Sequence, residues 1–393
     1  MVEKAFQGGK NYWMWLLFLF LLTIYGFIFY SKQLIYGLGI TGMGRDVSWG
    51  LYIANFTFFV GVAASAVMLV IPYYLHRVKE YSETLVFAEF LAVASVFLAI
   101  LFVFVDLGKP ERVFNVLIYP SPNSLLFWDM VVLSGYLLLN VILGWKGLDL
   151  AKKGIDSPRW LKILIYTSIP WAISIHTVTA FIYCGLLSRP FWFSSLLAPR
   201  FLASAFTSGP SILLALCLVL NRLTGFDPGL RVLENLKKTV TYALSIHIFF
   251  LVAEFFTTFY SGSPEHLRHF EYLLLGSGGH YWLTALSWFS LIASIFSFLT
   301  LISTGFSKNR VLIFVTLLIL IFAIWVEKGL TLIVTGFNPT VDLRIVRYVP
   351  TFEEISITLG VWSLGALILT LLFKIAISIK RSLPPQISLS ERK

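Results

Sequence analysis

Charged residues are scarce in this sequence, and cysteine is nearly absent. Asp, Glu, Lys and Arg make up 13% of the 393 residues, whereas 58% are hydrophobic. A soluble domain carries about 25% charged residues, so this composition excludes an ordinary soluble protein. The two cysteines, Cys184 and Cys217, lie far apart in apolar stretches, and an iron–sulfur cluster generally needs four ligands. The sequence therefore predicts two buried thiols and no iron–sulfur cluster in this chain.

Apolar stretches of about 18–25 residues recur along the chain, which is the length of a transmembrane helix. Strands of a membrane barrel are shorter and alternate in polarity. We therefore predict an all-α fold, a polytopic bundle of about ten spanning helices. The predicted spans are 13–30, 51–75, 84–105, 125–145, 162–185, 201–220, 239–260, 281–304, 311–330 and 355–378. The first is interpreted as a retained anchor, because it lacks the small-residue cleavage site of a signal peptide.

The basic residues divide unequally between the two sides of the predicted bundle. About two thirds of the 30 Lys and Arg residues lie in the terminal segments and in the loops on the same side as the termini. Positive loops face the cytoplasm, so we predict a multi-pass protein of the cytoplasmic membrane, with both termini in the cytoplasm and long loops outside. The net charge of +10 then reflects these loops, and no nucleic-acid partner is expected.

Seven ionisable side chains fall within or at the ends of the predicted spans. Such residues cost about 2.5–3.5 kcal/mol to insert, which makes them functional candidates. They are Glu89, Asp106, Asp129, His176, His247, Glu254 and Glu327. His176 and Tyr183 are seven residues apart and share a helix face, as do His247 and Glu254. The competing interpretation is a hydrogen bond to a neighbouring helix carbonyl for the two histidines and a purely structural role for Asp129, Glu254 and Glu327. For Asp106 it is a solvated loop pair with Lys109, and for Glu89 a position at the cytoplasmic interface.

Residues Gly37–Gly42 fit the pattern G-x-G-x-x-G of dinucleotide sites. A dinucleotide site needs this turn between a strand and a helix of a soluble βαβ unit, whereas here it joins two spans. We therefore interpret the glycines as a flexible, closely packed outer loop. The 36 Phe residues are expected to face lipid and the core, although aromatic walls would also suit a flat quinone ring.

Three segments resemble the motifs of a known family. Residues 37–69 read GLGITGMGRDVSWGLYIANFTFFVGVAASAVML, Asp106–Arg112 read DLGKPER, and Pro120–Ser124 (PSPNS) are followed by Phe127–Asp129 (FWD). Together they resemble the NrfD/PsrC family of quinone-interacting membrane subunits. They are most similar to its DsrP branch, from the DsrMKJOP complex associated with sulfite reduction, and HybB is a near relation. The first and tenth predicted helices exceed the eight-helix pattern of the simplest family members.

The resemblance implies that the chain exchanges electrons between menaquinol or menaquinone and a ferredoxin-like iron–sulfur subunit on the periplasmic side. It implies no haem or cluster in this chain. A DsrMKJOP-like complex would add a membrane cytochrome b, a multihaem cytochrome c and cytoplasmic iron–sulfur subunits. Within one integral membrane domain, we expect the following parts: an extra helix in 1–30, a quinone-binding bundle in 49–185, a second bundle in 201–330, a C-terminal helix in 355–378 and a cytoplasmic tail in 379–393.

The resemblance also implies which residues act on the quinone. Asp129, His176 and Tyr183 are expected to contact the quinol oxygens, with Asp129 as the proton acceptor. The expected binding residues are Trp49, Tyr52, Asn55, Asp106, Arg112 and Trp128. Apart from the resemblance, the remaining ionisable residues suggest a proton path inward, which would couple the reaction to proton translocation. This path would use Glu89, His247, Glu254 and Glu327.

Three other functions stay open at this point. A haem b cytochrome needs paired His at matching depth, and the depths of His176 and His247 differ by about five residues, or ~7 Å. A secondary transporter often has helices broken in mid-membrane, whereas Pro170 is the main interruption in these spans. A purely structural anchor for other subunits would not explain the carboxylates inside the membrane.

Overall fold

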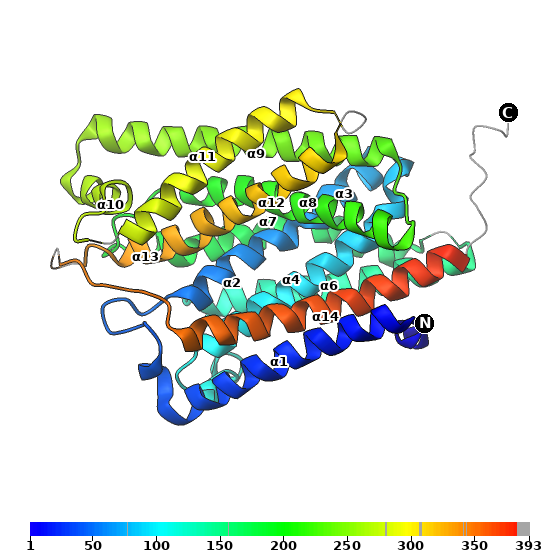
Figure 1. Cartoon of the computed structure of the whole chain (residues 1–393), viewed down its shortest axis with the longest axis horizontal. Helices are drawn as coiled ribbons and strands as arrows, with labels where there is room; N and C mark the ends of the chain where they lie inside the picture. Colours follow the sequence, from blue (N-terminus) through cyan, green and yellow to red (C-terminus); the bar gives the residue numbers. More distant parts are fainter. Residues whose placement is uncertain are drawn as a thin grey trace.

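The computed structural model describes residues 1–76, 78–155, 157–279, 281–305, 309–340, 342 and 344–382, which form a bundle of helices (Figure 1). The long helices are α1 Lys10–Tyr36, α2 Leu51–Val62, α4 Ser82–Asp106, α6 Leu125–Lys153, α7 Arg159–Cys184, α8 Leu197–Thr224, α9 Leu230–Ser261, α10 Pro264–Leu275, α11 Tyr281–Ser303, α12 Arg310–Trp325 and α14 Phe352–Ser382. The short helices are α3 Val67–Val70, α5 Asn115–Ile118 and α13 Leu332–Phe337. Ten stretches in these ranges are long and apolar enough to span a membrane, which confirms the predicted all-α bundle.

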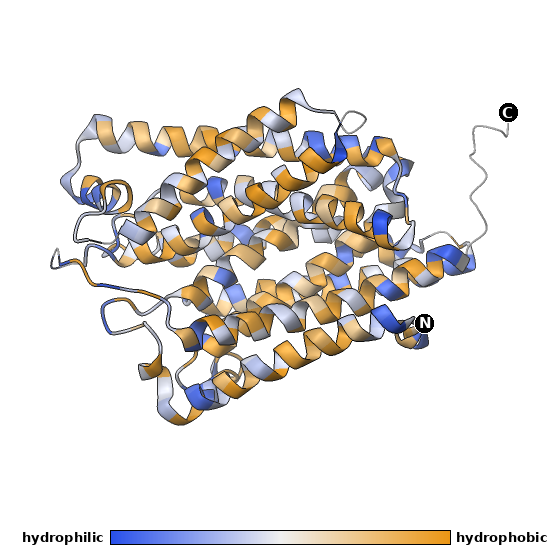
Figure 2. Cartoon of the chain, in the orientation of Figure 1, coloured by the Kyte–Doolittle hydropathy of each residue, from blue (hydrophilic) through white to orange (hydrophobic). Residues whose placement is uncertain are grey.

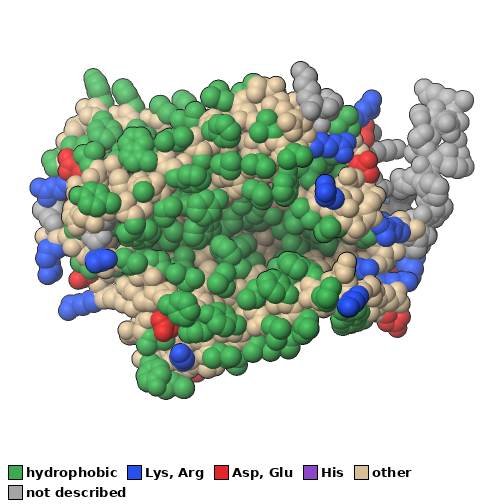
Figure 3. Space-filling view, viewed as in Figure 1, with side chains coloured by type: hydrophobic (Ala, Val, Ile, Leu, Met, Phe, Trp, Pro, Cys, Tyr) green, Lys and Arg blue, Asp and Glu red, His purple; other side chains and the backbone are tan. Residues whose placement is uncertain are grey.

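The surface shows where lipid would lie. Hydrophobic side chains cover the middle of the bundle, whereas Lys, Arg, Asp and Glu gather at its two ends (Figure 3). The ribbon coloured by hydropathy shows the same division, with further polar residues inside the bundle (Figure 2). α1 begins at the end of the bundle where α14 ends (Figure 1). We call the opposite end, where α1 ends and α14 begins, the outer end, after the prediction that it faces outwards.

Some of the predicted features fall on residues without a described structure. Four of the cations counted for the orientation, Arg77, Lys308, Arg392 and Lys393, and most of the predicted tail, 383–393, lie outside the described residues. The cytoplasmic placement of the termini and the division into two bundles therefore stay predictions.

Several helices are longer than their apolar stretches. α6 continues to Lys153 and α9 begins at Leu230, whereas the predicted spans were 125–145 and 239–260. The extra turns carry basic residues and lie outside the hydrocarbon region. They stay helical there because a helix satisfies its own backbone hydrogen bonds. The apolar run thus marks the hydrocarbon region rather than the ends of the helix.

Two spans contain non-α turns that the sequence pattern did not reveal. The second span continues from α2 through a 3₁₀ turn at Ala63–Ser65 and α3 into a π turn at Ile71–Leu75. The ninth span passes from α12 through a π turn at Val326–Thr331 into α13. The second of these π turns contains no proline, so its position is set by packing. Single π turns are frequently found at functional sites, which makes this one a candidate.

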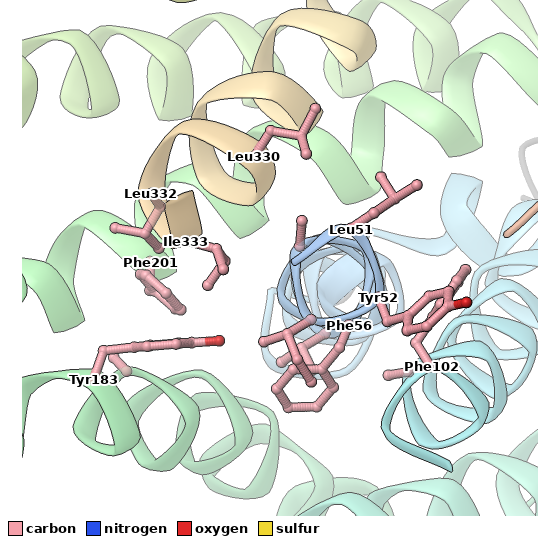
Figure 4. Close-up of a cluster of buried hydrophobic side chains, with 14 of the residues drawn as sticks. Leu51, Tyr52, Phe56, Phe102, Tyr183, Phe201, Leu330, Leu332 and Ile333 are labelled. Carbon is pink, nitrogen blue, oxygen red and sulfur yellow. The ribbon is translucent and has the colours of Figure 1, made fainter. Parts of the chain in front are cut away.

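α2 lies at the centre of the bundle, against α4, α8 and the π turn Val326–Thr331. Nearly all of its residues are buried, so it is apolar on every side, as expected for a core helix. Tyr52 and Tyr183 lie on opposite sides of α2, and the hydroxyl of Tyr183 points toward it (Figure 4). By contrast, α1 lies at the periphery and packs on α14, where Gly26 and Gly360 allow the two backbones to touch.

The glycine-rich loop before α2 is packed closely against the loop before α14. The Tyr348 hydroxyl accepts a hydrogen bond from Leu51 N at 2.6 Å and donates one to Glu354 at 2.9 Å. The carboxylate of Glu354 also accepts from Gly42 N at 2.8 Å. A Cβ at Gly42 or Gly50 would overlap the second loop, so close packing accounts for these glycines. The two loops together fix the start of α2.

Candidate functional site

A cavity of about 740 Å³ opens at the outer end of the bundle, between α4, α6, α7 and the loop 107–124. Ligand sites in proteins occupy about 300–1,000 Å³, so the space suits a small organic molecule. Five of the predicted site residues line the cavity: Trp49, Asp106, Arg112, Asp129 and Tyr183. Most of the remaining wall is apolar and includes Ile53, Phe56, Ile100, Val103, Phe104, Phe127, Leu133 and Ile182. The fold therefore brings residues of all three motif segments to one space.

Two carboxyl groups reach this cavity from different helices. Asp129 lies in the second turn of α6 and is 6% exposed, and its Oδ1 accepts a hydrogen bond from Thr179 Oγ1 at 2.6 Å. Asp106 is the last residue of α4, and its buried Oδ1 has no hydrogen-bond partner among the described residues. An unsatisfied buried acceptor is costly, so Asp106 is well placed to accept a hydrogen bond from a ligand.

Aromatic rings also line the cavity. The indole of Trp49 lies edge-on to the Tyr183 ring, with centroids 5.8 Å apart, and stacks on Trp192 at 5.9 Å. The Tyr183 hydroxyl is 2.6 Å from Thr57 Oγ1 on α2. Thr57 Oγ1 donates its one hydrogen to Ile53 O at 2.8 Å, so the Tyr183 hydroxyl donates to Thr57 and offers a ligand an acceptor. Trp192 and Thr57 were not among the predicted residues.

Four predicted residues lie outside the cavity wall. The Asn55 amide donates to Leu51 O at 2.8 Å and accepts from Trp325 Nε1 and Trp362 Nε1, each at 3.0 Å. Its donor is therefore engaged within α2, and its acceptor joins α2 to α12 and α14. Tyr52 points to the other side of α2, where its hydroxyl donates to Gln33 Oε1 at 2.7 Å.

The other two are His176 and Trp128. His176 is fully buried, and neither of its ring nitrogens has a hydrogen-bond partner within the described ranges. Trp128 is 45% exposed at the start of α6, and its indole donates to Pro122 O at 2.7 Å. This hydrogen bond links the PSPNS turn to the start of α6.

A second polar group lies deep between α8, α9 and the π turn Val326–Thr331. Arg200 of α8 bonds the carboxylates of both Glu254 and Glu327. His247 Nε2 lies 3.4 Å from Glu327 Oε2, which is within ion-pair distance. The structure therefore joins three of the four residues of the predicted proton path. Glu89 is 3% exposed on α4, which packs mainly against α2, α6 and α14.

The third of the Lys and Arg residues that the sequence analysis assigns to the outer side includes Arg200 and Lys328, and for these two the assignment to the outer loops was wrong. Arg200 is 8% exposed and Lys328 is 2% exposed, and both lie inside the bundle. The predicted boundary of the sixth span came too late, because α8 begins at Leu197 and not at 201. The burial of Lys328 depends on the π turn, for which the sequence has no signal. The sequence does place two carboxylates, Glu254 and Glu327, within spans in this region. A buried carboxylate needs a cation as its partner, so these residues could have indicated a buried cation nearby.

In the part of the chain that the structure describes, no group of three or more His, Cys, Asp or Glu side chains is placed so that it could hold a metal ion. Cys217 is buried, and Cys184 is half-buried, with its thiol directed to Ser194 O at 3.4 Å.

The fold and the cavity define an integral membrane protein with a ligand-sized site near one end of its helical bundle. The profile described as "Polysulphide reductase, NrfD" matches residues 39–339, and the chain belongs to this NrfD family. The match leaves out α1 and α14, the two helices that exceed the eight-helix pattern of the simplest family members.

Three similar proteins are named as subunits of reductases or of a menaquinol oxidoreductase. The chain is 28% identical to a putative membrane subunit of dimethyl sulfoxide reductase from Halobacterium salinarum, over 90% of this chain and 88% of the relative. It is 27% identical to a selenate reductase subunit from Mesobacillus selenatarsenatis, over 65% and 67% of the two chains. It is 24% identical to the Hdr-like menaquinol oxidoreductase integral membrane subunit of Archaeoglobus fulgidus, over 70% and 68%.

Proposed function

We propose that this chain is the quinone-interacting membrane subunit of a respiratory redox complex, and that the cavity binds menaquinol or menaquinone. The observation that carries the proposal is the combination of a 740 Å³ apolar cavity with two carboxyl groups and a tyrosine hydroxyl on its wall. The name of the Archaeoglobus relative includes menaquinol oxidoreductase activity, and the other two are named as subunits of reductases.

Oxidation of a quinol releases two electrons and two protons, and each needs an acceptor. Aspartate and tyrosine side chains can accept and pass protons. Asp129 is the proposed acceptor for one quinol hydroxyl, and Asp106, with its unsatisfied oxygen, is the proposed partner of the other. The electrons would pass to an iron–sulfur subunit docked at the outer end, as the family resemblance implies.

The remaining wall residues would hold and orient the ring. Trp49 and Tyr183 present aromatic faces and edges, which attract a flat conjugated ring. Arg112 is exposed where the cavity meets the loop 107–124, so it is proposed to contact the ligand or an acidic partner. Placement in the DsrP branch and assembly with the DsrMKJOP-type subunits stay predictions.

The test is a binding titration of the purified full chain with a fluorescent quinol-site inhibitor. Asp129→Asn keeps the shape of the site but removes a charged acceptor, whose hydrogen bond contributes about 1.5–3 kcal/mol. We expect the Kd to rise by about 10- to 100-fold. Tyr183→Phe should weaken binding by a smaller factor, because it removes a neutral hydroxyl.

The matched control is Asp149→Asn, which makes the same change on the same helix at the opposite end, where Asp149 pairs with Lys153 on the surface. It should leave the Kd unchanged. Equal Kd values for wild type and Asp129→Asn, or no saturable quenching in folded protein, would refute the proposed site.

A further inference from the structure

The buried group on the second half of the bundle has an incomplete charge balance. The Arg200 guanidinium lies between two carboxylates, and its Nε donates to Glu327 Oε1 at 3.0 Å. Arg200, Glu254 and Glu327 are all nearly inaccessible to solvent. Two carboxylates and one guanidinium leave one negative charge uncompensated. Such a charge is costly inside a membrane protein unless a nearby base carries a proton.

Two bases can supply this positive charge, and they approach from different sides. His247 of α9 places Nε2 3.4 Å from Glu327 Oε2, yet neither ring nitrogen has a hydrogen-bond partner in the described chain. Lys328 follows Glu327 directly, and its Nζ donates to Phe201 O at 3.1 Å. The same Nζ lies 4.6 Å from the centre of the Phe201 ring and faces Gly61 of α2.

The π turn allows this arrangement. Adjacent residues of a regular helix point about 100° apart, so a charged pair on the edge of a bundle normally places one member toward lipid. Here all six residues of the turn, Val326–Thr331, are buried. Glu327 can therefore face α8 and α9 while Lys328 faces α2 and α8. The π turn thus holds Glu327 against Arg200 and His247, and Lys328 against Phe201 and α2.

We propose that Arg200, Glu254, Glu327, His247 and Lys328 form a proton-binding site that holds one exchangeable proton, shared between His247 and Lys328. When the proton moves from Lys328 Nζ to the imidazole, the lysine becomes a neutral amine and the histidine an imidazolium, so the total charge is unchanged. The site goes beyond the proposed quinone function and does not depend on it. Among the described residues, two further ionisable groups also interact electrostatically with its members: His176 on α7 with Lys328, and His266 on α10 with Glu254.

The site adjoins the quinone cavity through one aromatic ring. Phe201 contacts Lys328 and also lies 5.8 Å from the Tyr183 ring, which lines the cavity. On the opposite side, Arg200, Glu254 and Glu327 line a space of about 30 Å³ together with Ser287, Ser290 and Thr331. This space is large enough for a water molecule, so a proton could reach the site from α11. Because Phe201 connects Lys328 to Tyr183 on the cavity wall, charge in the cavity would change which base holds the proton.

The test is nitrogen-15 NMR of the full chain in lipid at pH 7, with labelled histidine and lysine. The His247 signal, one of six from histidine, is identified by its loss in His247→Gln. In wild type we expect a charged Lys328 and a neutral His247. In Lys328→Met the proton must move to the other base, so His247 should become an imidazolium. Lys328→Arg restores a fixed positive charge and should keep His247 neutral.

A second variant checks that the carboxylate is the cause. Glu327→Gln added to Lys328→Met removes the uncompensated charge, so His247 should return to the neutral form. The proposal is overturned if both bases are charged, or both neutral, in wild type. It is also overturned if His247 stays neutral in Lys328→Met while thermal unfolding shows the variant to be folded.

Discussion

Replacing Arg200 by methionine would remove the cation that bonds both Glu254 and Glu327, while it keeps an unbranched apolar side chain in place. Both carboxylates would then be buried and facing each other without their shared partner. Loss of one partner of a buried ion pair costs about 3–5 kcal/mol, and here one residue serves two pairs. We therefore expect the free energy of unfolding to fall by at least about 3 kcal/mol.

The assay is equilibrium unfolding of the purified chain in mixed detergent micelles, followed by circular dichroism. Arg231→Met is the matched control, because Arg231 also pairs with a glutamate but is 86% exposed, and an exposed pair contributes at most about 1 kcal/mol. Adding Glu254→Gln and Glu327→Gln to Arg200→Met should recover most of the loss. The reasoning is refuted if Arg200→Met and Arg231→Met unfold alike, or if the neutral triple variant is no more stable than Arg200→Met.

Three further predictions concern packing and pH. Gly336→Ala should destabilise the fold by about 1–3 kcal/mol and weaken inhibitor binding, because the new Cβ would overlap the Trp192 ring behind the cavity. Gly50→Ala should lower the unfolding temperature, because its Cβ would displace the Tyr348 hydroxyl from the start of α2. His269 Nδ1 lies within hydrogen-bond distance of two carbonyl oxygens, and burial lowers the pKa of this side chain. The unfolded chain therefore binds the proton more readily than the folded chain, so stability should fall as the pH drops below about 6.5. The fall should be smaller in His269→Gln.

Gly44→Ala is the control for the glycine substitutions. A Cβ at Gly44 meets no atom within 4 Å, so this variant should unfold like wild type. If Gly50→Ala and Gly44→Ala behave alike, the contact with Tyr348 does not constrain the loop. A pH dependence that is the same in His269→Gln and wild type would assign the acid sensitivity to other groups.

The candidate site shows how much of a binding site can be predicted from positions in the sequence. Asp106, Asp129 and Tyr183 stand in segments far apart in the sequence, and the expectation that they meet at one end of the bundle agrees with the wall of the cavity. Asn55 has the ideal chemistry for a quinone carbonyl, but two tryptophans from distant helices already occupy its acceptor. Residue type predicts what a side chain can bind, whereas the neighbours that have already bound it are set by packing.

The apolar runs by themselves determined that this is a membrane protein, with ten helices among the described residues that are long and apolar enough to span a membrane. Each run must satisfy its own backbone in lipid, and only a helix of that length does so. The motif segments determined its family. The tertiary structure decided which polar residues share a space: it placed the π turn at Val326–Thr331, buried Arg200 and Lys328, and assembled one charge centre from three elements. The physical reason is that a buried charge is stable only beside its partners, and those partners lie on helices that are distant in sequence and adjacent only after folding.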